Sequence, residues 1–120
     1  MRLASVLALL LIAPIPALAQ DVPAAREQDL WCGAAFTLAV RDVPETAAPE
    51  IKSVTEPYRL GADMLVGRAR AAFLEFGYTE EAFIDLLAET EAEVDKELAS
   101  TDPSVAPRFS FEDCAALIGQ

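Results

Sequence analysis

The sequence predicts an all-α protein, a small single-domain bundle braced by one disulfide. Three observations carry that prediction. Apolar residues recur at helical spacing, residues typical of helix caps flank the periodic stretches, and two cysteines follow a leader typical of exported proteins. We expect about four helices, over residues 25–40, 57–76, 80–99 and 111–118.

Residues 1–19 have the layout of a secretory signal peptide. Arg2 precedes an apolar run over residues 3–12, and a small-x-small cleavage site ends the segment. The run is too short to span a bilayer, which takes about 20 apolar residues, and Pro14 and Pro16 interrupt the apolar residues after it. We therefore expect a cleaved leader, export to the periplasm or the exterior, and no stable membrane insertion of the mature chain.

The mature chain, residues 20–120, has the length of one domain with a single modest core. The whole sequence has a net charge of −11, and because Arg2 is the only charged residue of the leader, the mature chain carries −12. Such acidity argues against nucleic acid and anionic lipid as partners, since their phosphates would be repelled. It favours a basic protein partner, although solubility is the simpler explanation. The oligomeric state stays open.

Cys32 and Cys114 are the only cysteines. In an oxidising compartment such a pair predicts one disulfide, here between the first helix and the last. It would close a loop of about 80 residues and stabilise the fold by roughly 4 to 5 kcal/mol on the chain-entropy model. The pair is not a CxxC motif, and the chain has no histidine to complete a zinc site. We therefore expect neither a thiol-redox role nor a metal.

The first expected helix, residues 25–40, is apolar nearly all round from Leu30 to Val40. Helices of this kind lie in the middle of a domain. We expect Trp31 to be part of the core, with its indole N–H reaching a carbonyl or water at the edge. The next segment, residues 41–56, is polar and rich in proline, and we interpret it as an ordered loop with at most one helical turn.

The second expected helix, residues 57–76, begins at Pro57 because proline suits the first turn of a helix. Gly61 and Gly67 are candidates for close crossings with a neighbouring helix, and Gly77 ends the helix in the left-handed conformation. One apolar stripe runs along it at helical spacing. Its members are Leu65, Ala69, Ala72, Phe73 and Phe76.

The third expected helix, residues 80–99, is capped by Thr79. Since only Tyr78 separates that cap from Gly77, we expect the second and third helices to form an antiparallel hairpin. The apolar stripe of the third helix predicts its buried face. Its members are Phe83, Leu86, Leu87, Thr90, Val94 and Leu98.

The last expected helix, residues 111–118, comes after a second loop and is capped by Ser110. It is too short to hold itself in water, so the bond from Cys114 to Cys32 explains how it would stay docked. Its inward face is expected to include Phe111, Cys114, Leu117 and Ile118.

No catalytic motif stands out. Without histidine, the chain lacks the commonest general base and metal ligand, and no serine has an evident base partner. We expect no enzyme, no cofactor and no metal site. Four acids on one face of the third helix are the candidate site: Glu81, Asp85, Glu89 and Glu93. They could bind a cation or dock a basic partner, and a merely solvated face is the simplest alternative.

Three functions are compatible with these features. The first is a non-catalytic interaction module that binds or inhibits a basic envelope protein. The second is a conditional chaperone: in acid the mature charge would swing to about +8, and the fold could open around its disulfide. That plan is similar in class, without a shared motif, to small periplasmic acid-stress chaperones. The third is an enzyme with two close carboxylates in a cleft.

Overall fold

The computed structural model describes residues 22–120 and confirms the all-α class. The expected leader, residues 1–19, lies outside the described residues. Three of the four expected helices, those over residues 25–40, 80–99 and 111–118, are reproduced to within one residue at each end. The elements are α1 (Ala24–Val40), α2 (Pro49–Glu75), α3 (Glu80–Ala99) and α4 (Phe111–Leu117).

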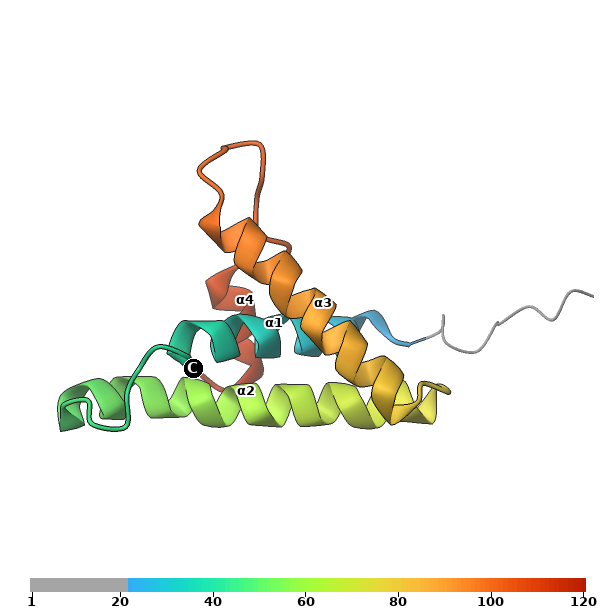
Figure 1. The fold of residues 1–120 in the computed structure, drawn as a ribbon, viewed down its shortest axis with the longest axis horizontal. Helices are drawn as coiled ribbons and strands as arrows, with labels where there is room; N and C mark the ends of the chain where they lie inside the picture. Colours follow the sequence, from blue (N-terminus) through green and yellow to red (C-terminus); the bar gives the residue numbers. More distant parts are fainter. Residues whose placement is uncertain (1–21) are drawn as a thin grey trace, which may run out of the picture.

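Helix α1 lies at the centre of the bundle, along α2 and beneath α3 (Figure 1). This position follows from its composition, since a helix that is apolar on most sides has to be covered on most sides. Two clusters of buried side chains flank it. The first is formed by Trp31, Cys32, Ala34, Phe36, Ala62, Leu65, Val94 and Cys114, and the second by Val22, Leu30, Ala69, Phe73 and Phe83.

The expected start of the second helix at Pro57 is wrong, because α2 begins eight residues earlier, at Pro49. Pro49 occupies the first turn, where the missing N–H costs nothing, and Pro57 lies inside the helix. Inside the helix, Pro57 leaves the carbonyl of Ser53 without its usual donor. Ser53 is exposed, so water can replace that donor. The segment expected to be a loop therefore ends at residue 48.

The end of α2 is set by Gly77, whose φ of 101° confirms the left-handed residue expected there. The N–H of Gly77 donates to the Leu74 carbonyl at 3.2 Å, and that of Tyr78 donates to the Phe73 carbonyl at 3.0 Å. These two bonds form a Schellman motif. Its hydrophobic contact is also present, since the Phe73 and Tyr78 rings meet edge to face at 4.9 Å. Thr79 caps α3, as expected, by accepting the N–H of Ala82.

The expected hairpin of the second and third helices is not formed. α2 and α3 meet only near their shared turn, and α3 then leaves α2 and crosses α1 (Figure 1). The physical reason is that α1 has apolar surface on two sides and lies between the two helices. Burying that surface stabilises the fold more than pairing α2 with α3 along their length would.

The glycines of α2 differ in what surrounds them. A Cβ built on Gly61 would lie 2.7 Å from Cγ2 of Ile118 and 3.1 Å from its Cβ, so α4 approaches α2 at this residue. Gly67 has nothing within 4 Å. The expected close crossing is thus confirmed at Gly61 and wrong at Gly67.

We expect opposite effects of alanine at these two positions. Gly67→Ala should raise the free energy of unfolding by about 0.5–1 kcal/mol, because alanine restricts the unfolded chain and favours a helix. Gly61→Ala should lower it by about 1–3 kcal/mol, because Ile118 has to shift. Urea denaturation followed by circular dichroism measures both. Equal effects of the two substitutions would contradict the placement of α4 against Gly61.

Candidate functional site

The predicted disulfide is present, with Cys32 and Cys114 bonded at 2.09 Å and their Cα atoms 5.2 Å apart. It joins the middle of α1 to the middle of α4. Ser110 caps α4 by accepting the N–H of Asp113, as expected. The bond therefore fixes the start of α4 and the segment before it, residues 107–110, against α1.

Trp31, next to the disulfide, is the central side chain of the candidate site. It is only 2% exposed, as expected of a core residue. Its indole N–H donates to Oε2 of Glu97 at 3.2 Å, so its polar partner is a carboxylate of α3 rather than a carbonyl or water. The Phe109 ring packs edge to face on the indole, 5.6 Å away. Trp31 thereby links α1, α3 and the second loop, and a hollow lies on each side of it.

The first hollow, which we call the apolar groove, has a volume of about 250 Å³. It lies between α1, the end of α3 and the start of α4. Nearly all of its wall is carbon. Its lining residues are Trp31, Ala35, Phe36, Ala39, Leu98, Pro107, Phe109, Ser110, Phe111 and Cys114.

Two side chains expected in the core instead stand at this groove. Leu98 is 52% exposed and Phe111 is 64% exposed. Leu98 belongs to the last turn of α3, in which the neighbouring Glu97 still bonds to Trp31 of α1. Phe111 is at the first position of α4, where its ring contacts Phe36 and Tyr58 from outside. Helical spacing places both on apolar stripes, but no further element among residues 22–120 covers them.

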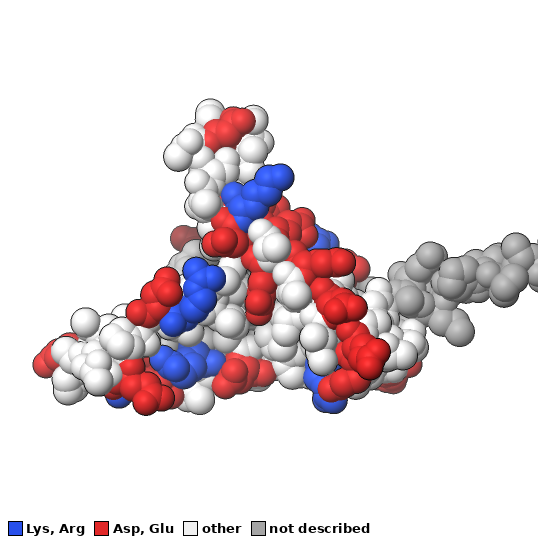
Figure 2. All heavy atoms as spheres, viewed as in Figure 1, with Lys and Arg blue, Asp and Glu red and all other residues white. Residues whose placement is uncertain are grey.

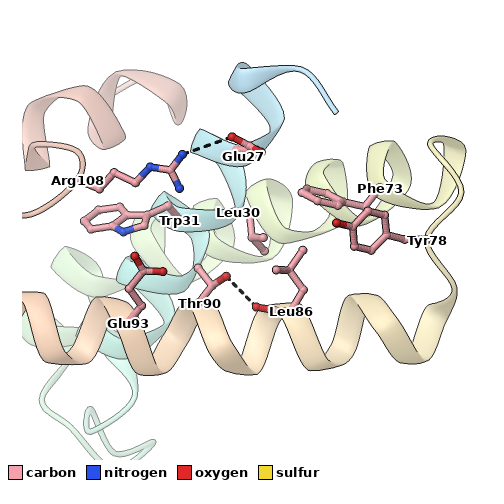
Figure 3. Close-up of a pocket in the computed structure, with 9 residues that line it drawn as sticks. All are labelled: Glu27, Leu30, Trp31, Phe73, Tyr78, Leu86, Thr90, Glu93 and Arg108. Atoms are coloured by element: carbon pink, nitrogen blue, oxygen red, sulfur yellow. Dashed lines mark hydrogen bonds and ion pairs between the residues drawn. The ribbon is translucent and has the colours of Figure 1, made fainter. Parts of the chain in front are cut away.

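The second hollow, which we call the α1–α3 cleft, has a volume of about 160 Å³ (Figure 3). Its walls are mixed, with apolar side chains between the two helices and charged ones at the end near Trp31. Arg108 there donates to Glu27 at 3.3 Å, and Glu93 reaches toward the indole from α3. The lining residues are Glu27, Leu30, Trp31, Phe73, Tyr78, Leu86, Thr90, Glu93 and Arg108.

The segment 107–109 separates the two hollows. Pro107 and Phe109 line the apolar groove, whereas Arg108 between them lines the cleft. One short piece of chain therefore shapes both. It is preceded by a turn in which the Asp102 carboxylate accepts the N–H of Ser104 at 2.9 Å and its hydroxyl at 2.8 Å. The backbone hydrogen bond from Ser104, and to a smaller extent the one from its hydroxyl, lower the pKa of Asp102 below its ordinary value.

The acidic residues expected on one helix face, Glu81, Asp85, Glu89 and Glu93, are all exposed, and Figure 2 shows acidic side chains along α3. The row is not straight. Four residues advance a helix by about 40° beyond a full turn, so the row winds around α3. Glu93 lines the α1–α3 cleft, whereas Glu81, Asp85 and Glu89 do not. The last residue of the acidic row is therefore also part of the wall of the α1–α3 cleft.

Sequence reasoning missed an ion pair whose carboxylate is buried and whose arginine is 37% exposed. Asp29 of α1 is fully buried and accepts two hydrogen bonds from Arg68 of α2, both at 2.7 Å, while Arg26 approaches it to 3.1 Å. The bonds to Asp29 raise the pKa of Arg68 against the opposing effect of burial. The position of Asp29 could have predicted the pair. Asp29 lies seven residues before Phe36, so both residues share the face of α1 that is buried. A charge on that face requires a buried partner.

Within residues 22–120, no helix is both long and apolar enough to span a bilayer. In the same part of the chain, no three residues among cysteines and acids come close enough to hold a metal ion. The sequence matches no protein-family model, and no curated protein or solved structure is significantly similar to it. The function therefore has to be argued from the geometry of the two hollows and from charge.

Proposed function

We propose that this protein is a non-catalytic interaction module of the cell envelope or exterior that binds, and thereby inhibits, a basic protein. The apolar groove is the observation that carries the proposal. A hollow walled almost entirely by carbon, with Leu98 and Phe111 exposed at its edge, is the kind of surface that soluble proteins keep for a partner. The disulfide is compatible with an oxidising compartment, as export would require.

The size of the groove favours a protein side chain as its occupant. Pockets for small molecules have volumes of about 300–1,000 Å³, and the groove, at about 250 Å³, is smaller. A groove of this kind suits one or two large apolar side chains from a partner, the anchor residues of a protein interface. Because the disulfide and Trp31 hold its walls in place, little ordering would be needed on binding.

The charge of the protein favours a basic partner. A mature chain of net charge −12 repels acidic proteins and accelerates the approach of basic ones. The acidic row on α3 has no ion-pair partner within residues 22–120, so its charge is available. The apolar groove would then bind an apolar side chain of the partner, and the acidic row would increase the association rate by electrostatic attraction.

Capture from native envelope extract tests this proposal. Immobilised wild-type protein, the Leu98→Gln variant and the Ile84→Gln variant are compared by mass spectrometry. Leu98 and Ile84 are matched, because both lie on α3 and are 52% and 57% exposed, but only Leu98 lines the groove. We expect one stoichiometric basic partner, retained by Ile84→Gln and reduced at least about tenfold by Leu98→Gln.

The association rate of the captured partner, followed in real time at low salt, tests the acidic row. Neutralising Glu81, Asp85, Glu89 and Glu93 together should slow association about tenfold or more at low salt. The matched control neutralises four exposed acids elsewhere, Glu45, Glu50, Glu75 and Asp95, with the same change in net charge. Absence of any stoichiometric partner, or equal capture by the Leu98 and Ile84 variants, would contradict the proposal.

A conditional chaperone stays the second candidate, and one observation favours it. Three contacts between elements rest on carboxylates: Glu97 with Trp31, Glu27 with Arg108, and Glu80 with Arg70. These contacts hold α3 and the segment before α4 in place, and the disulfide would persist if they were lost. Unfolding near pH 3 together with suppressed aggregation of a client protein would support this function, and unfolding without that suppression would contradict it.

A further inference from the structure

We propose that the α1–α3 cleft receives one long cationic side chain, a lysine or an arginine, from the basic partner. This inference rests on the proposed function and specifies which part of the partner is recognised there. The cleft differs from the apolar groove in size and lining. Its volume, about 160 Å³, is well below that of small-molecule pockets and suits a single extended side chain.

The lining matches the two halves of such a side chain. Leu30 of α1, Phe73 of α2 and Leu86 of α3 form an apolar wall, against which the methylene stem would pack (Figure 3). Glu93 and Glu27 supply carboxylates at the Trp31 end. With Arg108 as the only cation of the lining, its net charge is −1, so a positively charged group is favoured there.

Glu93 is the carboxylate available to a new cation. It has no ion-pair partner within residues 22–120. Thr90, one helical turn before it, donates its hydroxyl hydrogen to the Leu86 carbonyl at 2.7 Å, which leaves the hydroxyl oxygen able to accept a further bond. The cleft thus offers the cation acceptors and no competing donor from α3.

Arg108 is a cation of the chain itself that already pairs with a carboxylate of the cleft. Its guanidinium approaches the Phe109 ring to 5.3 Å and donates to Glu27 at 3.3 Å, so one cation is already held beside the cleft. Arg108 and Glu27 are each nearly half exposed, so their pair is weak and open to exchange. A partner's cation would therefore compete with Arg108 for Glu27 while it gains Glu93. This predicts opposite effects of removing Glu93 and removing Arg108.

The experiment uses the folded protein and three small probes. N-acetyl-lysine methylamide, N-acetyl-arginine methylamide and the uncharged N-acetyl-norleucine methylamide are titrated at constant ionic strength. The readout is the indole N–H resonance of Trp31, which is the only tryptophan and lines the cleft. We expect this resonance to move with one or both cationic probes and not with the norleucine compound.

Matched variants separate the cleft from general charge. Glu93→Gln should weaken binding of the cationic probe at least about fivefold, and Glu89→Gln, one turn earlier on the same row, less than about twofold. Arg108→Gln should strengthen it by about threefold, whereas Arg41→Gln, at an exposed arginine that does not line the cleft, should leave it unchanged. These variants alter exposed side chains, so each is expected to fold.

The outcomes distinguish failure of the proposed cation site from failure of the proposed function. An indole resonance that ignores the cationic probes, follows norleucine equally, or responds alike to the Glu93 and Glu89 substitutions overturns the cation site. Such a result leaves the proposed function standing if a basic partner is still captured through the apolar groove. Conversely, binding of the cationic probes without any captured partner would retain the cleft as a cation site and overturn the interaction module.

Discussion

Replacing Cys32 and Cys114 with alanine should lower the free energy of unfolding by about 4–5 kcal/mol. The bond joins residues that are 82 positions apart, and the chain-entropy model assigns a constraint of this size to a loop of that length. Domains of this size are stable by only about 5–15 kcal/mol in total, so the loss would be a large part of the whole. Guanidinium denaturation of the oxidised protein and the double variant measures it.

The loss should be visible first in α4. This helix has seven residues, too few for stability in water, and apart from the disulfide it is held by side-chain contacts such as that between Ile118 and Gly61. Amide hydrogen exchange should therefore show residues 111–117 losing protection before α1 and α2 do. Reduction of the wild-type protein is the control, since these are its only cysteines. A loss below about 1 kcal/mol would contradict the role assigned to the disulfide.

Arg68→Met should cost about 3 kcal/mol, the second large effect. Without Arg68, the Asp29 carboxylate would stay fully buried with Arg26 as its only charged partner. Removing one member of a buried pair typically costs about 3–5 kcal/mol, and the lower end of that range applies because the Arg68 side chain is 37% exposed. The matched control is Arg70→Met, two residues further along α2. Arg70 pairs with Glu80 at the surface, so its loss should cost less than about 1 kcal/mol.

Two further measurements define this ion pair. Replacing both partners, Asp29→Leu with Arg68→Met, should recover most of the stability, because apolar side chains can replace a buried pair. The raised pKa of Arg68 means that folding favours its charged form. That contribution is present at every pH below the ordinary arginine value and is lost only as the pH rises beyond it. A double variant no more stable than Arg68→Met would contradict the assignment.

The local features of the fold could be predicted from the order of the amino acids alone. Helix α3 begins and ends where its cap and apolar spacing predict, at Glu80 and Ala99, and Gly77 adopts the left-handed conformation expected of it. These signals act within a few residues of the chain, so no tertiary information is needed to interpret them. The disulfide was also predictable, because two cysteines allow only one intramolecular pairing.

The packing of the helices, and the side chains that this packing leaves uncovered, depend on tertiary contacts. Helix α2 continues through Pro57 because its later turns pack on α1, and this packing outweighs the local cost of proline. Leu98 lies on an apolar stripe, yet burial of a stripe requires another element opposite it, and no element in the described part of the chain covers Leu98. The apolar groove lies at this end of α3, and the α1–α3 cleft lies where α3 crosses α1.

The partnering of charges depends on tertiary contacts in the same way. Asp29 and Arg68 are 39 residues apart in sequence, and their pairing requires the crossing of α1 and α2, which no local pattern encodes. The acidic row was visible in the sequence, but its meeting with the cleft at Glu93 was not. Local sequence specifies helices through short-range hydrogen bonds and side-chain spacing, whereas contacts between helices depend on which surfaces can be buried together.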